Sequence, residues 1–169
     1  MSAVAETVNE AGSVHEQQYL TFMMADEEYG VDILAVQEIR GWEESTMIPN
    51  APEYIRGVIN LRGTIVPIMD LRMRFGLQQV SYSPVTVVII LKVESSHGER
   101  VMGIVVDAVS DVYTISDQST RKPPELTEDR NSAFIKGLVN VNDKMVILLD
   151  VNELLKIPAS SHVPGLANN

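Results

Sequence analysis

Short apolar runs separated by turn-forming residues recur along most of the chain. They lie at residues 19–24, 29–31, 57–61, 64–69, 85–93, 100–106, 109–115, 137–141 and 144–149. The runs are rich in β-branched residues and too short to cross a membrane as helices, which is typical of buried or half-buried strands. Helical signals are few: Asp32 precedes a short turn at residues 33–36, and Asp150 precedes a terminal helix at residues 151–156. The pattern predicts a mainly β protein built from paired five-stranded antiparallel barrels.

Part of this pattern occurs twice. Residues 55–71, IRGVINLRGTIVPIMDL, recur as residues 135–151, IKGLVNVNDKMVILLDV, at a constant shift of 80 residues. The identical positions pair Ile55, Gly57, Asn60, Val66 and Asp70 with Ile135, Gly137, Asn140, Val146 and Asp150. Residues 30–39 and 103–112 form a second similar pair in the same order. An internal duplication into two subdomains follows, with the groove between them as a natural binding place. The alternative is that short aliphatic hairpins resemble one another by chance.

The length of the chain suits one domain or two small ones. We expect a disordered tail at residues 1–16, a domain at 17–157 and a frayed tail at 158–169. Within the domain, the repeat predicts subdomains at approximately 17–80 and 81–150, with a terminal helix at 150–156. Each half is near the lower size limit for an independent core, so the halves should share an interface.

Both repeated hairpins have turn-forming residues at their tips. Gly63, in the tip Arg62-Gly63, is expected to adopt a positive φ, and the equivalent residues Asn142 and Asp143 tolerate left-handed backbone angles. Pro67 removes a ladder donor, so we expect its strand to lie at a sheet edge or at a bulge. Residues 117–130 are polar and contain prolines, which predicts a long loop.

The formal net charge of -10 excludes several classes of partner. Phosphate backbones need clusters of Lys and Arg, and aromatic residues make up only 5% of the chain, too few for a base-stacking surface. Nucleic acid and anionic membrane surfaces are therefore poor candidates. The absence of Cys excludes disulfides and thiolate metal sites and suits a reducing cytoplasm. Because we find neither a membrane-span pattern nor the apolar core of a signal peptide, we expect a soluble protein without membrane insertion.

No arrangement of residues indicates catalysis, a metal or a cofactor. The three histidines lie in expected tails or in a turn, away from the apolar frame of a triad base or metal ligand: His15, His97 and His162. Motifs for nucleotide binding, zinc proteases and serine hydrolases are absent. Asp70 and Asp150 stand where a strand becomes a helix, so we interpret them as N-caps rather than as paired catalytic carboxylates. Four glutamates are expected to lie on solvated faces: Glu27, Glu28, Glu43 and Glu44.

Arg62 is the one residue whose position favours a binding role. Its repeat counterpart is Asn142, so the two hairpin tips match in backbone but differ in charge. In an acidic chain, a cation at the tip of an apolar hairpin indicates contact with a partner. The alternative is that Arg62 only bridges Asp70 or Glu38, an ion pair of small net worth if it is exposed.

Three segments resemble the bacterial chemotaxis coupling proteins of the CheW family. They are DEEYGVDILAVQEIRGWEE at residues 26–44, IRGVINLRGTIVPIMDLRMRFG at 55–76 and GIVVDAVSDV at 103–112. The motif N-L-R-G-x-I-V-P-x-x-D-L is specific to this family and to the homologous regulatory domain of the histidine kinase CheA. The likeness covers about residues 18–155 without a kinase ATP-binding segment or phosphotransfer helix. It therefore favours a stand-alone coupling protein.

The resemblance implies a fold of two packed five-stranded SH3-like β-barrels with short helices. The implied function is a non-catalytic adaptor that joins methyl-accepting chemotaxis receptors to CheA in cytoplasmic arrays at the inner membrane, without a cofactor. The alternative function is a regulatory or scaffold β-barrel module of another two-component signalling complex.

The resemblance also implies two sets of contact residues. A groove between the barrels would receive the receptor tip, with contributions from Val36, Gly57, Arg62, Gly63, Val87, Val88, Gly103 and Val109. Contacts to the kinase regulatory domain, and to further copies of the coupling protein, would use Glu38, Val112, Arg121, Glu125 and Leu126. Family members often have an aromatic residue where this chain has Leu126. For each valine, the alternative is a plain core position.

Overall fold

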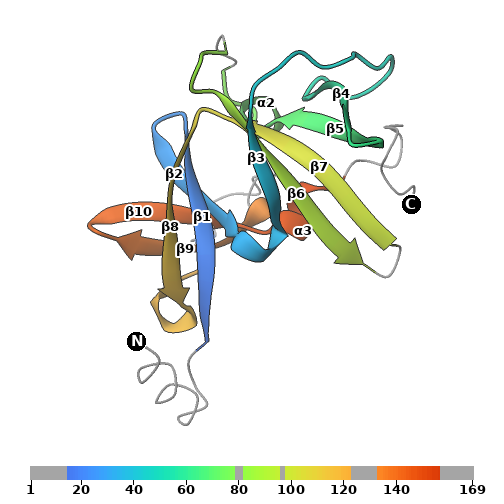
Figure 1. Ribbon diagram of the computed structural model, residues 1–169. Coiled ribbons are helices and arrows are strands. Elements are labelled where there is room, and N and C mark those ends of the chain that lie inside the picture. Colours follow the sequence, from blue (N-terminus) through green and yellow to red (C-terminus); the bar gives the residue numbers. More distant parts are fainter. Residues whose placement is uncertain (1–14, 79–81, 96–97, 123–132, 157–169) are drawn as a thin grey trace.

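Two five-stranded sheets, packed side by side, make up the described part of the protein (Figure 1). The computed structural model describes residues 15–78, 82–95, 98–122 and 133–156. The first sheet has the order β8-β1-β2-β10-β9, formed by Ala108–Ser116, Glu16–Met24, Glu27–Asp32, Lys144–Leu149 and Ile135–Val141. The second has the order β3-β6-β7-β5-β4, formed by Val36–Gly41, Val87–Ser95, Gly98–Val106, Thr64–Asp70 and Ile55–Leu61. The helical turns are η1 (Ile33–Ala35), α2 (Leu71–Arg74), η2 (Asp117–Ser119) and α3 (Val151–Leu154). The predicted fold class, mainly β with two five-stranded units and short helices, is thus confirmed. The sheets are not wholly antiparallel as predicted, because each contains one parallel pair.

The internal duplication is visible in the pairing of strands. In one sheet β10 runs parallel to β2 with Leu148 opposite Gly30, and in the other β5 runs parallel to β7 with Ile68 opposite Gly103. These pairs are related by the two shifts found in the sequence. Strands β1 to β5 therefore correspond in order to β6 to β10, and the two sheets have the same strand order.

The predicted division into barrels at residue 80 is nevertheless wrong. Each sheet takes two strands from one repeat and three from the other: β1 and β2 pair with β8 to β10, whereas β6 and β7 pair with β3 to β5. The chain crosses between the sheets after β2 and again after β7. The repeat boundary is therefore a boundary in sequence but not between packed units.

The apolar core consists of three clusters, of which one joins the two sheets. One lies within the first sheet and one within the second, while a larger central cluster contains residues of both sheets and of α3. Strand β6 shows how the sequence produces this arrangement. Ile89 and Leu91 face the central cluster, whereas Val88 and Ile90 face the cluster of their own sheet. Both faces of the strand are thus buried, which explains its continuous apolar run.

The hairpin tips have the predicted left-handed backbone. Gly63 has φ 89°, and Arg62 is also left-handed, with φ 52°. At the equivalent tip, Asn142 and Asp143 have φ 52° and 66°. Both connections are two-residue turns whose positive φ angles match the twist of the flanking strands.

The expectation that the Pro67 strand lies at a sheet edge is wrong, since β5 is flanked by β7 and β4. Its pairing with β7 begins only at Ile68, so the missing N–H of Pro67 interrupts no pairing there. The ladder to β4 has a register irregularity between Ile55 and Gly57, beside the proline. The expected irregularity is therefore present next to Pro67, on the partner strand β4, and not at Pro67 itself, which pairs with Val58.

The predicted N-caps are confirmed. The carboxylates of Asp32, Asp70 and Asp150 accept hydrogen bonds from the backbone N–H groups of Leu34, Met73 and Glu153. The terminal helix ends at Leu154, earlier than predicted, and Leu154 and Leu155 are fully buried.

Two expectations near the amino terminus need correction. Strand β1 begins at Glu16, inside the expected tail, because Glu16 pairs with Ser116 of β8. Glu28 is buried rather than solvated, since it lies in β2 opposite Val146 of the neighbouring parallel strand. The predictions for residues 1–14 and 158–169 concern parts of the chain outside the described residues.

Candidate interaction surface

An ion pair at the tip of the β4–β5 hairpin is the first element of the candidate surface. Arg62 Nη2 donates to Glu38 Oε1 at 2.6 Å, which joins the hairpin to edge strand β3. Glu38 Oε2 is also 3.4 Å from Nη1 of Arg40. The side chain of Arg62 is 73% exposed and that of Glu38 is 27% exposed. The bridge to Glu38, which we considered as an alternative role for Arg62, is therefore present.

The electrostatics of this pair follow from its geometry. The hydrogen bond from Arg62 holds the pKa of the Glu38 carboxyl below its ordinary value; burial opposes this shift, and the charges of Arg62 and Arg40 add to it. Glu38 is thus a carboxylate at neutral pH. Its bond to Arg62 uses one guanidinium nitrogen, and most of the Arg62 side chain lies at the surface.

The other expected partner of Arg62, Asp70, is occupied elsewhere. Its side chain is 2% exposed and accepts hydrogen bonds from the Tyr82 hydroxyl at 2.7 Å and from the Met73 N–H at 3.3 Å. Asp70 therefore serves as a buried cap.

A shallow surface connects Arg62 with Val36. One depression is lined by Arg62, Gln37, Lys92 and neighbouring strand residues, and an adjoining one by Leu34, Val36, Gln37, Lys92 and Glu94. Gln37 and Lys92 line both depressions. The structure thus brings Val36 and Arg62 onto one surface, formed by β3, the β4–β5 tip, β6 and β7.

The two sites expected at Val36 and Val109 are related by the repeat. Both side chains are half-buried against the central cluster, as is that of Val87. Val36 pairs with Leu91 and Val109 with Phe22, at equivalent places on the edge strands of the two sheets. These three valines therefore border the junction between the sheets.

Val88 and Gly103 lie deeper. Val88 is 4% exposed within the second sheet's cluster, and Gly103 is also buried. A Cβ atom at Gly103 would come within 2.8 Å of both Val88 Cγ1 and Ile68 Cδ1. Gly103 therefore lets Val88 and Ile68 pack together beneath the surface, and neither Val88 nor Gly103 offers a side chain to a partner directly.

The two glycines of the expected receptor site have different surroundings. Gly63 is exposed, and a Cβ there would meet no atom within 4 Å. Gly57 is buried with φ 145°, and a Cβ there would lie 2.6 Å from Ser45 Oγ and against the Thr46 carbonyl. The segment around Thr46 passes this close to Gly57 because the backbone of Thr46 forms a β-bridge with Val58, which covers the outer edge of β4. Gly57 is thus required by packing.

The expected kinase-contact residues are spread over both sheets. Val112 lies on edge strand β8 and is 42% exposed, whereas Glu38 belongs to β3. Arg121 is exposed, and its backbone pairs with that of Leu138 of β9 in an isolated antiparallel β-bridge. Glu125 and Leu126 lie outside the described residues.

Sequence reasoning missed an exposed apolar residue on β3. Ile39 is 45% exposed and is the repeat counterpart of Val112, so the two edge strands present equivalent aliphatic side chains. The repeat alignment of residues 30–39 with 103–112 contained this signal. Ile65 and Met145, each 47% exposed, form a second equivalent pair.

The described residues contain no cluster of three or more His, Asp or Glu side chains that could hold a metal ion. None of the helices in that part of the chain has the length and hydropathy of a membrane-spanning segment.

Comparison with known proteins identifies relatives along nearly the whole chain. A family model described as CheW-like domain matches residues 18–159. A protein named Chemotaxis protein CheW from Klebsiella aerogenes is 43% identical over 169 residues, which is 100% of this chain and 99% of that protein. The protein of the same name from Bacillus subtilis is 30% identical over 152 residues, covering 89% and 95%. The crystal structure of the scaffolding protein TtCheW from Thermoanaerobacter tengcongensis has a TM-score of 0.73 at 36% identity, covering 85% of this chain and 90% of that one.

Proposed function

The chain belongs to the CheW-like domain family, and on that premise we propose that it is a non-catalytic adaptor that links methyl-accepting chemotaxis receptors to the histidine kinase CheA. It acts in cytoplasmic arrays at the inner membrane. The observation that carries the proposal is the surface between Val36 and Arg62, which combines exposed charge at a hairpin tip with half-buried apolar side chains at the sheet junction.

The chemistry of this surface suits the helical hairpin tip of a receptor. The Arg62 guanidinium can donate several hydrogen bonds to carbonyl or carboxylate oxygens. Val36 offers apolar contact on the adjoining depression, and Val87 and Val109 offer it at the junction between the sheets. We include four further residues in the receptor site as supporting positions: Gly63 shapes the tip that carries Arg62, Gly57 allows β4 to pack against Thr46, and Val88 and Gly103 pack in the interior of the second sheet.

We assign contact with the kinase to a second set of residues. Glu38 lies on edge strand β3 and carries a charge paired with Arg62, and Val112 lies on edge strand β8 and offers exposed aliphatic surface to a protein partner. Arg121, with Glu125 and Leu126 in the following segment, provides a contact for the kinase regulatory domain or for a further copy of the adaptor.

Co-sedimentation of the purified chain with a receptor signalling fragment and with CheA tests this function. We expect the protein to bind each partner separately and to increase recovery of the kinase with the receptor. Binding to neither would contradict the proposal and favour a scaffold role in another two-component complex.

A double variant separates the two partner surfaces. Arg121→Asp with Leu126→Ser should retain receptor binding but weaken higher assembly with the kinase. Unchanged assembly in this variant would contradict the assignment of residues 121–126.

A further inference from the structure

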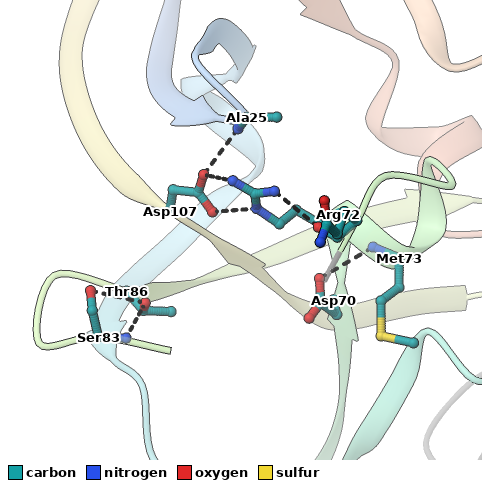
Figure 2. Close-up of polar contacts among 8 residues, drawn as sticks. Ala25, Asp70, Arg72, Met73, Ser83, Thr86 and Asp107 are labelled. Carbon is teal, nitrogen blue, oxygen red and sulfur yellow. Dashed lines mark hydrogen bonds and ion pairs between the residues drawn. The ribbon is translucent and has the colours of Figure 1, made fainter. Parts of the chain in front are cut away.

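The chain passes from the second sheet to the first through a single residue. Strand β7 ends at Val106 and β8 begins at Ala108, so only Asp107 separates the two sheets at this junction. The Asp107 N–H donates to the Met23 carbonyl of β1 at 3.1 Å. Asp107 lies between α2, which follows β5 of the second sheet, and the β1–β2 turn of the first sheet, and it bonds to both (Figure 2).

Arg72 and Asp107 form a two-pronged ion pair at this junction. Arg72 Nε donates to Asp107 Oδ1 at 2.9 Å, and Nη2 donates to Oδ2 at 2.7 Å. Asp107 Oδ2 also accepts the N–H of Ala25 at 2.9 Å, as Figure 2 shows. Ala25 has a left-handed φ of 52°, so the carboxylate fixes a turn that alanine does not favour by itself. We refer to Arg72, Asp107 and the Ala25 N–H as the clasp.

The clasp is firmly placed on both sides. Arg72 Nη1 donates to the Gln78 carbonyl at 3.0 Å, and the Arg72 side chain is only 17% exposed. A bidentate guanidinium–carboxylate pair fixes direction as well as distance. The three elements that the clasp joins, namely α2, the β7–β8 junction and the β1–β2 turn, therefore have one favoured arrangement. Apolar contact in the central cluster resists separation of the sheets but is not directional.

The clasp breaks the internal symmetry of the fold. The repeat counterpart of Arg72 is Asn152, and that of Asp107 is Leu34, which is 87% exposed at the other crossing between the sheets. At Leu34 the chain therefore crosses between the sheets without such an ion pair. The crossing at Asp107 does not by itself require the clasp.

We propose that the clasp is a positioning device that fixes the orientation of the two sheets, and with it the relative position of the half-buried valines Val36 and Val109 that border the junction between them. Val109 follows Asp107 by two residues on the first sheet, whereas Val36 belongs to the second. The part of the proposal that concerns receptor binding rests on the proposed function. The part that concerns orientation does not.

Distance measurements between two spin labels test the orientation directly. The chain has no Cys, so Cys residues introduced at Thr64 and Lys144 are unique labelling sites. Both positions are exposed and equivalent in the repeat, one on each sheet. The protein with an intact clasp should give one narrow distance distribution in pulsed electron paramagnetic resonance.

Weakening the clasp should broaden or shift this distribution. Asp107→Asn keeps the shape but removes the charge, and we expect the width to increase about twofold, as for packed elements freed to slide. Arg72→Lys keeps the cation without the fork and is the milder variant if Asp107→Asn fails to fold. It should broaden the distribution less. Lys156→Gln, which removes an ion pair within one helical turn of the chain, is the matched control and should leave the width unchanged.

A narrow, unshifted distribution in folded Arg72→Lys and Asp107→Asn proteins would overturn the proposal, even if both melt at lower temperature. In the unlabelled protein, Asp107→Asn should weaken binding of a receptor fragment at least about fivefold. The reason is that the apparent affinity falls with the fraction of molecules in which the two sheets have the arrangement that binds. Broadening without weaker binding would leave the orientation role in place and count against the receptor surface of the proposed function.

Discussion

Arg62 and Asn142 stand at equivalent hairpin tips with the same φ of 52°, and Arg62 alone of the two carries a charge, paired with Glu38 at 2.6 Å. Asn adopts left-handed backbone angles more readily than Arg does. The tip of the first hairpin therefore has a residue less suited to its backbone than the one at the second tip. This difference favours a role for the Arg62 side chain at the surface over a role in the turn.

Arg62→Asn should therefore leave the free energy of unfolding within about 0.5 kcal/mol of the unmodified protein. The variant gains a residue that suits the turn and loses an exposed ion pair of small net worth. Urea unfolding followed by circular dichroism measures this. A loss of several kcal/mol would make Arg62 a structural residue instead.

The two glycines of the first repeated hairpin should respond differently to alanine. Gly63→Ala adds a methyl group in open space and should cost about 1–2 kcal/mol for its left-handed backbone. Gly57→Ala adds strain at φ 145°, which residues with a side chain rarely adopt, and a clash with Ser45 and Thr46, so it should cost more than about 3 kcal/mol. Equal losses of stability for the two variants in urea unfolding would show that the segment at Ser45 and Thr46 moves aside at little cost.

A buried hydroxyl replaces regular pairing between β1 and β8. The β1–β8 register is irregular between Leu20 and Phe22; there, Thr21 Oγ1 donates to the Asp111 carbonyl and accepts the Asp111 N–H, both at 3.1 Å. Thr21→Val keeps the shape but removes both bonds and should cost about 1–3 kcal/mol. It should also speed hydrogen exchange at Asp111. Thr114→Val, at an exposed position of β8, is the control and should change stability by less than about 0.5 kcal/mol.

The clasp should make stability depend on pH in the acid range. Burial alone raises the pKa of Asp107, but the hydrogen bonds from Arg72 and the Ala25 N–H, with the Arg72 charge, bring it below the ordinary value. The folded-state pKa is thus lower than the unfolded one, near 3.9. Its stabilisation is complete above that pH and is lost as pH falls through the folded-state pKa.

A comparison of the unmodified protein with Asp107→Asn isolates this effect. Asp26 and Asp70 also act on Arg72, and both variants retain them. The stability difference between the two proteins should be largest near pH 6 and should shrink towards pH 3 in urea unfolding. A difference that stays constant over this range would show that the Asp107 charge does not contribute.

Local pattern was sufficient to find most strands, the hairpin tips and the three Asp caps. Each of these depends on residues close in sequence, such as Asp70 and the N–H of Met73. The repeat also revealed which strands correspond. It did not reveal the exchange of strands between sheets, because equivalent strands have equivalent patterns whichever partner they pair with.

Long-range polar contacts were beyond the reach of sequence reasoning. Nothing in the sequence near Arg72 or Asp107, 35 residues apart, indicates that they pair. Burial of Glu28 was also missed, because its charge suggested a solvated turn and its strand partner Val146 lies far along the chain. Among the candidate valines, exposure separates Val112 from buried Val88, although both belong to similar apolar runs.

Receptor binding by Arg62→Glu, with Asn142→Glu as the matched control, tests the proposed adaptor function most directly. Both substitutions place a carboxylate at an equivalent exposed tip. The exchange variant Arg62→Glu with Glu38→Arg restores an ion pair between the two positions but not a cation at the tip. Titration of each protein with a receptor signalling fragment, alongside its melting temperature, gives the comparison.

We predict that Arg62→Glu remains folded and loses well over tenfold in affinity, that the exchange variant does not regain it, and that Asn142→Glu binds normally. Normal binding by folded Arg62→Glu, or full recovery in the exchange variant, would contradict a direct contact between Arg62 and the receptor.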